Sequence, residues 1–129
     1  RLFRAAALAE KFHAQNHFRA LGNLKSTEEN LQTAIDGENY EHENMYPDFI
    51  DKAKEENAGQ ALSSFKYAKK VEEKHENFYR KALEAVKEGK DLEVEEWYVC
   101  PVCGNTMSGD IPEKCPICST PKEKFKIVE

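Results

Sequence analysis

The sequence predicts a mainly α-helical fold, in which a bundle of long helices is followed by a small domain held together by metal ligands. Two observations predict it. Residues 1–89 contain one of the five prolines, and their apolar residues recur at the three- and four-residue spacing of helices. Residues 95–129 contain all four cysteines and the other four prolines, in short alternating stretches typical of strands and turns. We therefore divide the chain into a helical domain, residues 1–90, and a cysteine-containing domain, residues 91–129.

The helical domain is expected to contain three helices joined by short connections. They cover residues 1–21, 26–57 and 60–88, and each ends at a glycine, namely Gly22, Gly59 and Gly89. Ser26 lies three residues before Glu29, which is the spacing of a capping box at the start of the second helix. Pro47 is expected to kink that helix or to widen one of its turns. Helices of this length, about 42 Å for about 28 residues, pack as an up-and-down bundle.

In the cysteine-containing domain, two stretches are predicted to pair as short strands because their side chains alternate between apolar and polar. These stretches are EEWYVCPVCG and KEKFKIVE.

The composition narrows the class of function. The chain carries a formal net charge of −5, which argues against a nucleic-acid partner because nucleic-acid binding requires a basic surface. The sequence contains no run of 18 apolar residues and no recognisable signal peptide. We therefore expect no membrane span, no secretion and a cytoplasmic location.

Acidic residues and histidines lie on the apolar stripe of each predicted helix. They form three pairs at a spacing of three residues, Glu10 with His13, Glu38 with Glu41, and Glu72 with His75. Residues three apart on a helix point the same way, so each pair presents two ligands to one point. Unpaired carboxylates in a core are costly, and no lysine or arginine shares these stripes. A multivalent cation is therefore the better explanation, and di-iron carboxylate bundles use this pattern of Glu and Glu-x-x-His.

Plainer explanations exist for some of these residues. Solvated or salt-bridged helix faces are the alternative to a metal cluster. His17 and His42 each lie about one turn from the proposed cluster. For these two we favour hydrogen-bonded packing residues over groups that support the metal ligands.

The cysteines form two Cys-x-x-Cys pairs, Cys100 with Cys103 and Cys115 with Cys118, separated by eleven residues. Two such pairs bring four thiolates into a tetrahedron that takes zinc or a single iron. Gly104 can adopt the positive φ that the turn favours, whereas Ser119 at the equivalent place is expected to strain the second turn. A structural zinc ribbon and a pair of disulfides are the alternatives.

Together these features resemble the rubrerythrin family. The matching stretches are AEKFHAQNH, GENYEHENMYP, VEEKHENFYRKA, CPVCG and CPICSTPKEKF. The resemblance covers essentially the whole chain, and it implies a ferritin-like four-helix bundle followed by a rubredoxin-like domain. Three of the four bundle helices have counterparts here. The family's first helix and its Glu ligand do not, and we expect a separate polypeptide to supply them.

The resemblance also implies a role for each site residue. Glu10 and Glu72 would bridge two irons, Glu38 and His75 would be terminal ligands, and His13 and Glu41 would exchange on one iron as it changes oxidation state. Tyr46 would lie beside the di-iron site. The four cysteines, Cys100, Cys103, Cys115 and Cys118, would bind one iron as an FeS4 site.

The activity implied by the resemblance is that of a non-haem di-iron peroxidase, which reduces hydrogen peroxide to water in oxidative-stress defence. The cofactors would be two oxo- and carboxylate-bridged irons and the FeS4 iron, with zinc as a substitute metal. Electrons would come from NAD(P)H through rubredoxin or a rubredoxin reductase, and the FeS4 site would relay them. A ferroxidase or iron-handling protein is one alternative, and a non-enzymatic zinc or electron-transfer module is another.

A homo-oligomer is expected for two reasons. A bundle about 40 Å long can hold the tail domain far from its own di-iron site, which favours electron transfer between subunits. The short link between the first two helices resembles compact family members, and this implies that helix pairs are exchanged between subunits.

Overall fold

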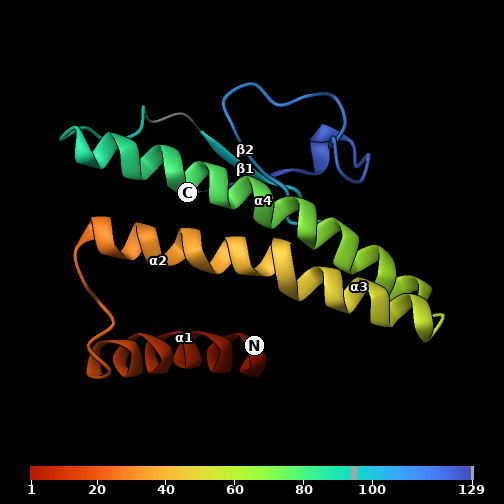
Figure 1. Ribbon diagram of the computed structural model, residues 1–129, viewed down its shortest axis with the longest axis horizontal. Helices are drawn as coiled ribbons and strands as arrows, with labels where there is room; N and C mark the ends of the chain where they lie inside the picture. Colours follow the sequence, from red (N-terminus) through yellow and green to blue (C-terminus); the bar gives the residue numbers. More distant parts are fainter. Residues whose placement is uncertain (94–95, 129) are drawn as a thin grey trace.

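The computed structural model describes residues 1–93 and 96–128, and it confirms the mainly α-helical fold (Figure 1). Its helical elements are α1 (Leu2–Ala20), α2 (Thr27–Tyr40), the π-helix η1 (Glu41–Met45), α3 (Tyr46–Glu55) and α4 (Gly59–Lys87). The other elements are β1 (Trp97–Val99), β2 (Thr106–Ser108), the 3-10 helix η2 (Lys122–Lys124) and β3 (Lys126–Ile127). Three residues lie outside the described part of the chain, namely Val94, Glu95 and Glu129. Glu95 and Glu129 are the outer ends of the two predicted strand stretches. None of the described helices is long and apolar enough to cross a membrane.

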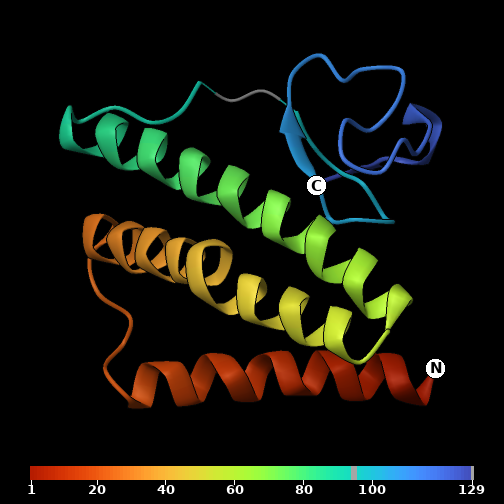
Figure 2. The same cartoon turned by 45° about the vertical axis from the view of Figure 1, so that its right-hand side comes forward.

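The long helix α4 lies at the centre of the arrangement. In both views α2 and α3 run along one side of α4, and the strands of the small domain lie on its other side (Figure 1, Figure 2). The buried aliphatic residues of the helical domain come from these three helices, and they are Ile35, Ala53, Val71 and Leu83. This small core holds the α2–α3 arm against α4.

The second predicted helix is one continuous helical path with a π-helix in its middle. The capping box at its start is confirmed, because the Ser26 side chain accepts a hydrogen bond from the Glu29 N–H and the Ser26 N–H donates to the Glu29 side chain. In η1 the Tyr46 N–H bonds the Glu41 carbonyl five residues back. Pro47 follows at once and has no N–H to donate to a helix. The predicted widening near Pro47 is therefore confirmed as a π-turn.

The end of this arm differs from the prediction at Gly59. The helix α3 ends at Glu55, and Asn57 takes the left-handed conformation with a φ of 54°. Asparagine adopts this conformation more readily than most residues, so it can end the helix without a glycine. Gly59 is instead the first residue of α4.

The helix α1 stands apart from the rest of the chain. Every one of its residues is exposed, and it makes no close backbone contact with another described helix or strand. Its large apolar side chains include Phe3, which is 90% exposed, and Leu8 and Phe12, which are each 54% exposed. An amphipathic helix of this kind is stabilised by packing its apolar face, and the described part of this chain does not cover that face.

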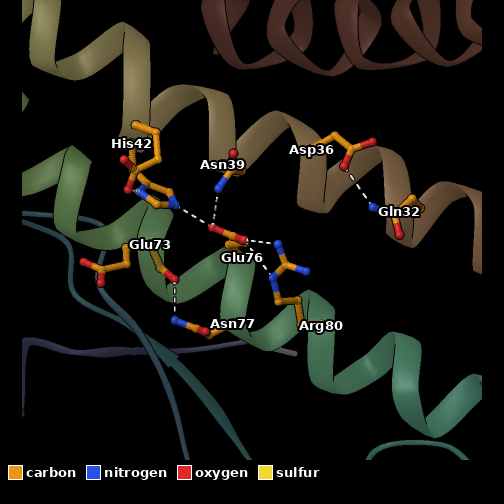
Figure 3. Close-up of polar contacts among 9 residues, drawn as sticks. Gln32, Asp36, Asn39, His42, Glu73, Glu76, Asn77 and Arg80 are labelled. Carbon is orange, nitrogen blue, oxygen red and sulfur yellow. Dashed lines mark hydrogen bonds and ion pairs between the residues drawn. The ribbon is translucent and has the colours of Figure 1, made fainter.

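A buried polar network ties the α2–η1 arm to α4 (Figure 3). The Glu76 carboxylate lies 2.5 Å from His42 Nε2, accepts a hydrogen bond of 3.3 Å from Asn39 and pairs with Nε and Nη2 of the Arg80 guanidinium. The other ring nitrogen of His42 lies 3.1 Å from Glu43. The hydrogen bonds that Glu76 accepts from His42, Arg80 and Asn39, above all the one from His42, lower its pKa. The geometry of His42 agrees with a hydrogen-bonded packing residue.

The small domain contains an antiparallel sheet in the order β2-β1-β3. The predicted pairing of the two flanking stretches is confirmed, since Tyr98 pairs with Ile127 and Val99 with Lys126. The strand β2, which pairs with β1, was not predicted because its three residues, Thr106–Ser108, are too few to show alternation.

Replacing Glu76 with alanine should lower the free energy of unfolding by about 3 to 5 kcal/mol, because His42, Asn39 and Arg80 lose their shared acceptor. Urea denaturation followed by the helical circular dichroism signal measures this change. Glu73→Ala is the matched control, since Glu73 is an exposed carboxylate on the same helix, and it should change stability by less than about 0.5 kcal/mol. Equal losses in both variants would contradict a stabilising network at Glu76.

Candidate metal centres

Three of the predicted ligands meet between α2 and α4. His75 Nδ1 lies 2.8 Å from Glu72 Oε2 and 3.6 Å from Glu38 Oε1, and ligand atoms from all three residues lie within 4.8 Å of one another. Glu72 and His75 are three residues apart on α4, so one helical turn presents both to the same point. Glu38 faces them from α2. All three side chains are largely buried, with exposed fractions of 16% for Glu72, 17% for Glu38 and 26% for His75.

The electrostatics of this trio favour a cation. In residues 1–93 and 96–128, no lysine or arginine forms an ion pair with Glu38 or Glu72. Burial, followed by the adjacent Glu72 carboxylate, raises the pKa of Glu38 to about 7. The hydrogen bond to Glu72 likewise raises the pKa of His75 above its ordinary value. The trio therefore shares protons that a bound divalent cation would displace, and carboxylate oxygens with an imidazole suit iron or manganese.

Glu41 and Tyr46 lie beside the trio. Glu41 is in η1, and its charge contributes to the raised pKa values of Glu38 and His75, although its oxygens are outside the close set. Burial, and then the charges of Glu72 and Glu41, raise the pKa of Tyr46. The Tyr46 ring packs near Phe49 and Phe65, with centroid distances of 6.1 and 6.3 Å.

Sequence reasoning did not include Tyr79 among the site residues. Burial raises the pKa of its phenol, and the charges of Glu38 and then Glu72 raise it further. Tyr79 follows His75 by four residues on the same stripe of α4, and this spacing was the signal that could have identified it.

The first predicted pair, Glu10 and His13, is not brought to the trio. His13 Nδ1 lies 3.2 Å from Glu10 Oε2, and the two side chains are 60% and 75% exposed on α1. His17 is exposed on the same helix. The reason is the position of α1, which runs alongside the α2–α3 arm but makes no close backbone contact with α2 or α4 (Figure 1).

The four cysteines form a compact group. Cys100 Sγ lies 3.6 Å from Cys118 Sγ, and Cys103 Sγ lies 3.6 Å from Cys115 Sγ. A tetrahedral site with metal–sulfur bonds of about 2.3 Å requires sulfur–sulfur distances of about 3.8 Å. The four thiols are free and can therefore act as ligands, so the group fits a zinc or iron ion.

The two cysteine turns have matching backbones. The Gly104 N–H bonds the Cys100 carbonyl and the Ser119 N–H bonds the Cys115 carbonyl, both at 2.9 Å. Gly104 has a φ of 78°, and Ser119 has a φ of 62°. The left-handed backbone that we expected at Gly104 is therefore present, and Ser119 adopts it despite the cost of its side chain.

One of the two thiols in the first turn, that of Cys100, ionises more readily than an ordinary cysteine. Burial opposes ionisation of Cys100, but the backbone N–H groups of Cys103 and Val102 outweigh it and lower the pKa of Cys100 to about 6. Burial, and hydrogen bonds with the other sulfurs, raise the pKa of Cys103. One thiolate forms readily, and further thiolates require a positive charge in their midst.

The cysteine-containing domain contacts the trio of Glu38, Glu72 and His75 within one chain. His75 Nε2 lies 2.8 Å from the hydroxyl oxygen of Thr106, which is three residues after Cys103. The expected long separation between the tail domain and its own bundle site is therefore wrong, because the chain after α4 turns back along that helix (Figure 1). No sequence signal pointed to Thr106, since the contact joins residues 31 positions apart.

We expect the metal-free protein to lose up to about 3 kcal/mol of folding stability as the pH rises from 4.5 to about 7. In this interval folded Glu38 keeps a proton that unfolded Glu38 has released, so the folded state binds more protons and stability falls with pH. Urea denaturation at successive pH values measures the slope. Glu38→Gln should remove it between these limits, whereas the exposed-residue control Glu73→Gln should keep it. A slope unchanged in Glu38→Gln would contradict the assignment.

Comparison with known proteins finds a matching family for each of the two parts of the chain. The family described as rubrerythrin matches residues 1–83, and the rubrerythrin, rubredoxin-like domain matches residues 98–126. Rubrerythrin-2 of Clostridium acetobutylicum is 37% identical to this chain, over 98% of the chain and 76% of its own length. Nigerythrin of Nitratidesulfovibrio vulgaris is 34% identical, over 97% of this chain and 67% of its own.

Solved structures agree with the sequence relatives. Nigerythrin in a mixed-valence state superposes with a TM-score of 0.72 at 36% identity, over 81% of this chain and 50% of that chain. The fully reduced, all-ferrous state of nigerythrin gives the same values. This chain thus spans about half the length of the nigerythrin structures. These matches confirm the ferritin-like and rubredoxin-like architecture, and the chain belongs to the rubrerythrin family.

Proposed function

We propose that this chain acts as a non-haem di-iron peroxidase, which reduces hydrogen peroxide to water. Each peroxide takes up two electrons and two protons and yields two water molecules. The membership of the rubrerythrin family supports a redox function based on iron. The more specific reaction is our proposal for this chain.

The observation that carries the proposal is the contact between His75 and Thr106. It joins the carboxylate and histidine cluster to the domain that carries the four cysteines, three residues beyond Cys103, within one chain. A ferroxidase that uses dioxygen as oxidant needs no adjacent one-electron carrier, whereas a peroxidase must have its irons reduced again after every turnover. The four-cysteine site next to His75 is suited to that reduction.

The site residues have distinct proposed tasks. A pair of ferrous ions would supply two electrons to the O–O bond. Glu38, Glu72 and His75 would hold these ions, with Glu41 within reach from η1. The phenols of Tyr46 and Tyr79, whose pKa values are raised beside these carboxylates, stay protonated at neutral pH and can donate hydrogen bonds at the edge of the site.

The electrons are proposed to reach Cys100, Cys103, Cys115 and Cys118 from an NAD(P)H-dependent reductase, directly or through rubredoxin. From there they would pass through the Thr106–His75 contact of the same chain. We place the activity in the cytoplasm, where thiols remain reduced and available to a metal. We also propose that the functional division of the chain falls between residues 90 and 91.

Replacing Glu72 with alanine should reduce the iron bound at the trio to less than two ions per site. Peroxide turnover should fall by about a thousand-fold or more, because a metal clamp contributes several kcal/mol to the transition state. Iron analysis together with peroxide consumption measures both effects. The control Glu73→Ala removes an exposed neighbouring carboxylate and should leave both values unchanged. Tyr46→Phe should keep the metals and alter turnover modestly.

The oxidant separates the proposed function from its alternatives. Reduced, iron-loaded protein should be oxidised faster by hydrogen peroxide than by dioxygen, and the FeS4 absorption should bleach and recover in each cycle. Faster oxidation by dioxygen, with continued uptake of ferrous iron, would identify a ferroxidase. A colourless, zinc-containing protein without turnover would identify the non-enzymatic alternative.

We further propose that α1 completes the site of a second copy. Glu10 and His13 are paired on an exposed helix whose apolar face has no cover in the described residues, whereas Glu38, Glu72 and His75 provide only three ligands. Exchange of α1 between two copies would bury that face and bring the missing ligands. The separate polypeptide that would add a further glutamate stays a prediction.

A complementation experiment tests this exchange. One chain carries Glu10→Ala and a second, differently tagged chain carries Glu72→Ala, and the mixed dimer is purified through both tags. If α1 is exchanged, one of the two sites receives both unaltered residues, so the mixed dimer should regain about half of the wild-type activity. Each single-variant dimer is the control and should be inactive. A mixed dimer without activity would show that α1 serves its own chain.

A further inference from the structure

One face of α4 fastens the small domain to the bundle. Three of its residues, which lie within little more than one helical turn, each contact a different residue of that domain. The contacts are Lys74 Nζ to Asn105 Oδ1 at 2.8 Å, His75 Nε2 to Thr106 Oγ1 at 2.8 Å, and the Phe78 ring to the Trp97 ring at a centroid distance of 4.9 Å. The middle contact involves a proposed metal ligand.

The hydrogen bonds of Thr106 favour a proton on Nε2 of His75. The Thr106 hydroxyl donates to the Gly104 carbonyl at 3.3 Å, so its oxygen is left to accept the hydrogen bond from His75. Nε2 of His75 must then carry the proton that is donated. Nδ1, which faces Glu72 and Glu38, is then the nitrogen that can offer a lone pair to a cation once the proton that it shares with Glu72 is displaced.

Asn105 holds Thr106 in place relative to both domains. Its side chain is fully buried and accepts the hydrogen bond from Lys74. Its carbonyl accepts the Cys100 N–H at 2.9 Å, and its backbone N–H bonds the Cys103 sulfur. The residue directly before Thr106 is thus fastened to α4 on one side and to the first cysteine turn on the other.

We propose that Thr106 is a positioning residue for His75, and that docking of the four-cysteine domain on α4 is required for the trio to bind metal well. This inference rests on the proposed function, in which His75 is a metal ligand. Histidine ligands commonly donate their second N–H to an acceptor that sets the ring orientation and tautomer, and loss of that acceptor weakens metal binding. Here the acceptor comes from the other metal domain, so a single contact links the two centres.

The test uses the full chain with one zinc ion per chain at the four cysteines. Mn²⁺ is then added, and the disappearance of the free-ion magnetic resonance signal reports binding at the trio. Thr106→Val removes the hydroxyl at nearly constant volume and should weaken Mn²⁺ binding by roughly ten- to a hundred-fold. Thr106→Ser keeps the hydroxyl and should retain wild-type affinity. Thr33→Val, which removes a hydroxyl that bonds only within α2, is the matched control.

Two further measurements separate positioning from general loss of structure. In protein labelled with ¹⁵N-histidine, the Nε2-bound proton of His75 should exchange slowly in wild type and in Thr106→Ser, and rapidly in Thr106→Val. Trp97 is the only tryptophan, so its quenching by iodide reports docking of the small domain. Lys74→Met should expose Trp97 and weaken Mn²⁺ binding, although Lys74 is not a ligand.

The outcomes are distinct. Wild-type Mn²⁺ affinity and slow Nε2-proton exchange in Thr106→Val would overturn the inference and leave the proposed metal site intact. Equal weakening in Thr106→Val and Thr106→Ser would also overturn it, because the hydroxyl would then not be the cause. Absence of Mn²⁺ binding in the wild-type chain would overturn the proposed metal site itself and the inference with it.

Discussion

The burial of two facing carboxylates with no lysine or arginine to neutralise them is the constraint on which the rest of this structure depends. Glu38 and Glu72 lie together between α2 and α4, where no lysine or arginine of the described residues pairs with them. Such a pair repels itself unless it binds protons or a cation. The raised pKa of Glu38 is the consequence for the protein, and it makes the functional centre the part of the bundle that opposes folding above pH 4.5.

The hydrogen-bonded network at Glu76 stabilises the fold and offsets part of the free energy that the burial of Glu38 and Glu72 costs. Glu76 directly follows His75 on α4, yet its carboxylate is surrounded by His42, Asn39 and Arg80, which lower its pKa. Two acids about one turn apart on α4 therefore have opposite environments. Glu76 is neutralised and hydrogen-bonded by protein groups, whereas Glu72 has no lysine or arginine partner among the described residues and is available to a cation. Glu76 also fastens η1 to α4 through His42, which follows Glu41 in the chain. The π-turn that carries Glu41 is thus held on the same side as the trio.

Local patterns allowed most elements and the residues of the two clusters to be predicted, and the misses share a cause. The helices, the capping box at Ser26 and both cysteine turns follow from spacing and turn chemistry within a few residues. The position of α1, and with it Glu10 and His13, depends on which surface covers its apolar face, and no residue of α1 specifies that surface. Thr106 was missed for a related reason, because its role comes from the docking of one domain on another.

Docking of the four-cysteine domain on α4 implies an order in which the two sites take up metal. A domain of about 35 residues cannot bury enough apolar surface to fold alone, so it relies on its metal for stability. Asn105 and Thr106 take their positions from the turn around Cys100 and Cys103, and these two cysteines would be ligands of that metal. If Thr106 orients His75, the trio acquires its full affinity only after the four-cysteine site is loaded. A chain without a metal at its four cysteines would then also bind metal poorly at the trio. Under the proposed function, this would limit the formation of a di-iron centre that could be oxidised but not reduced again.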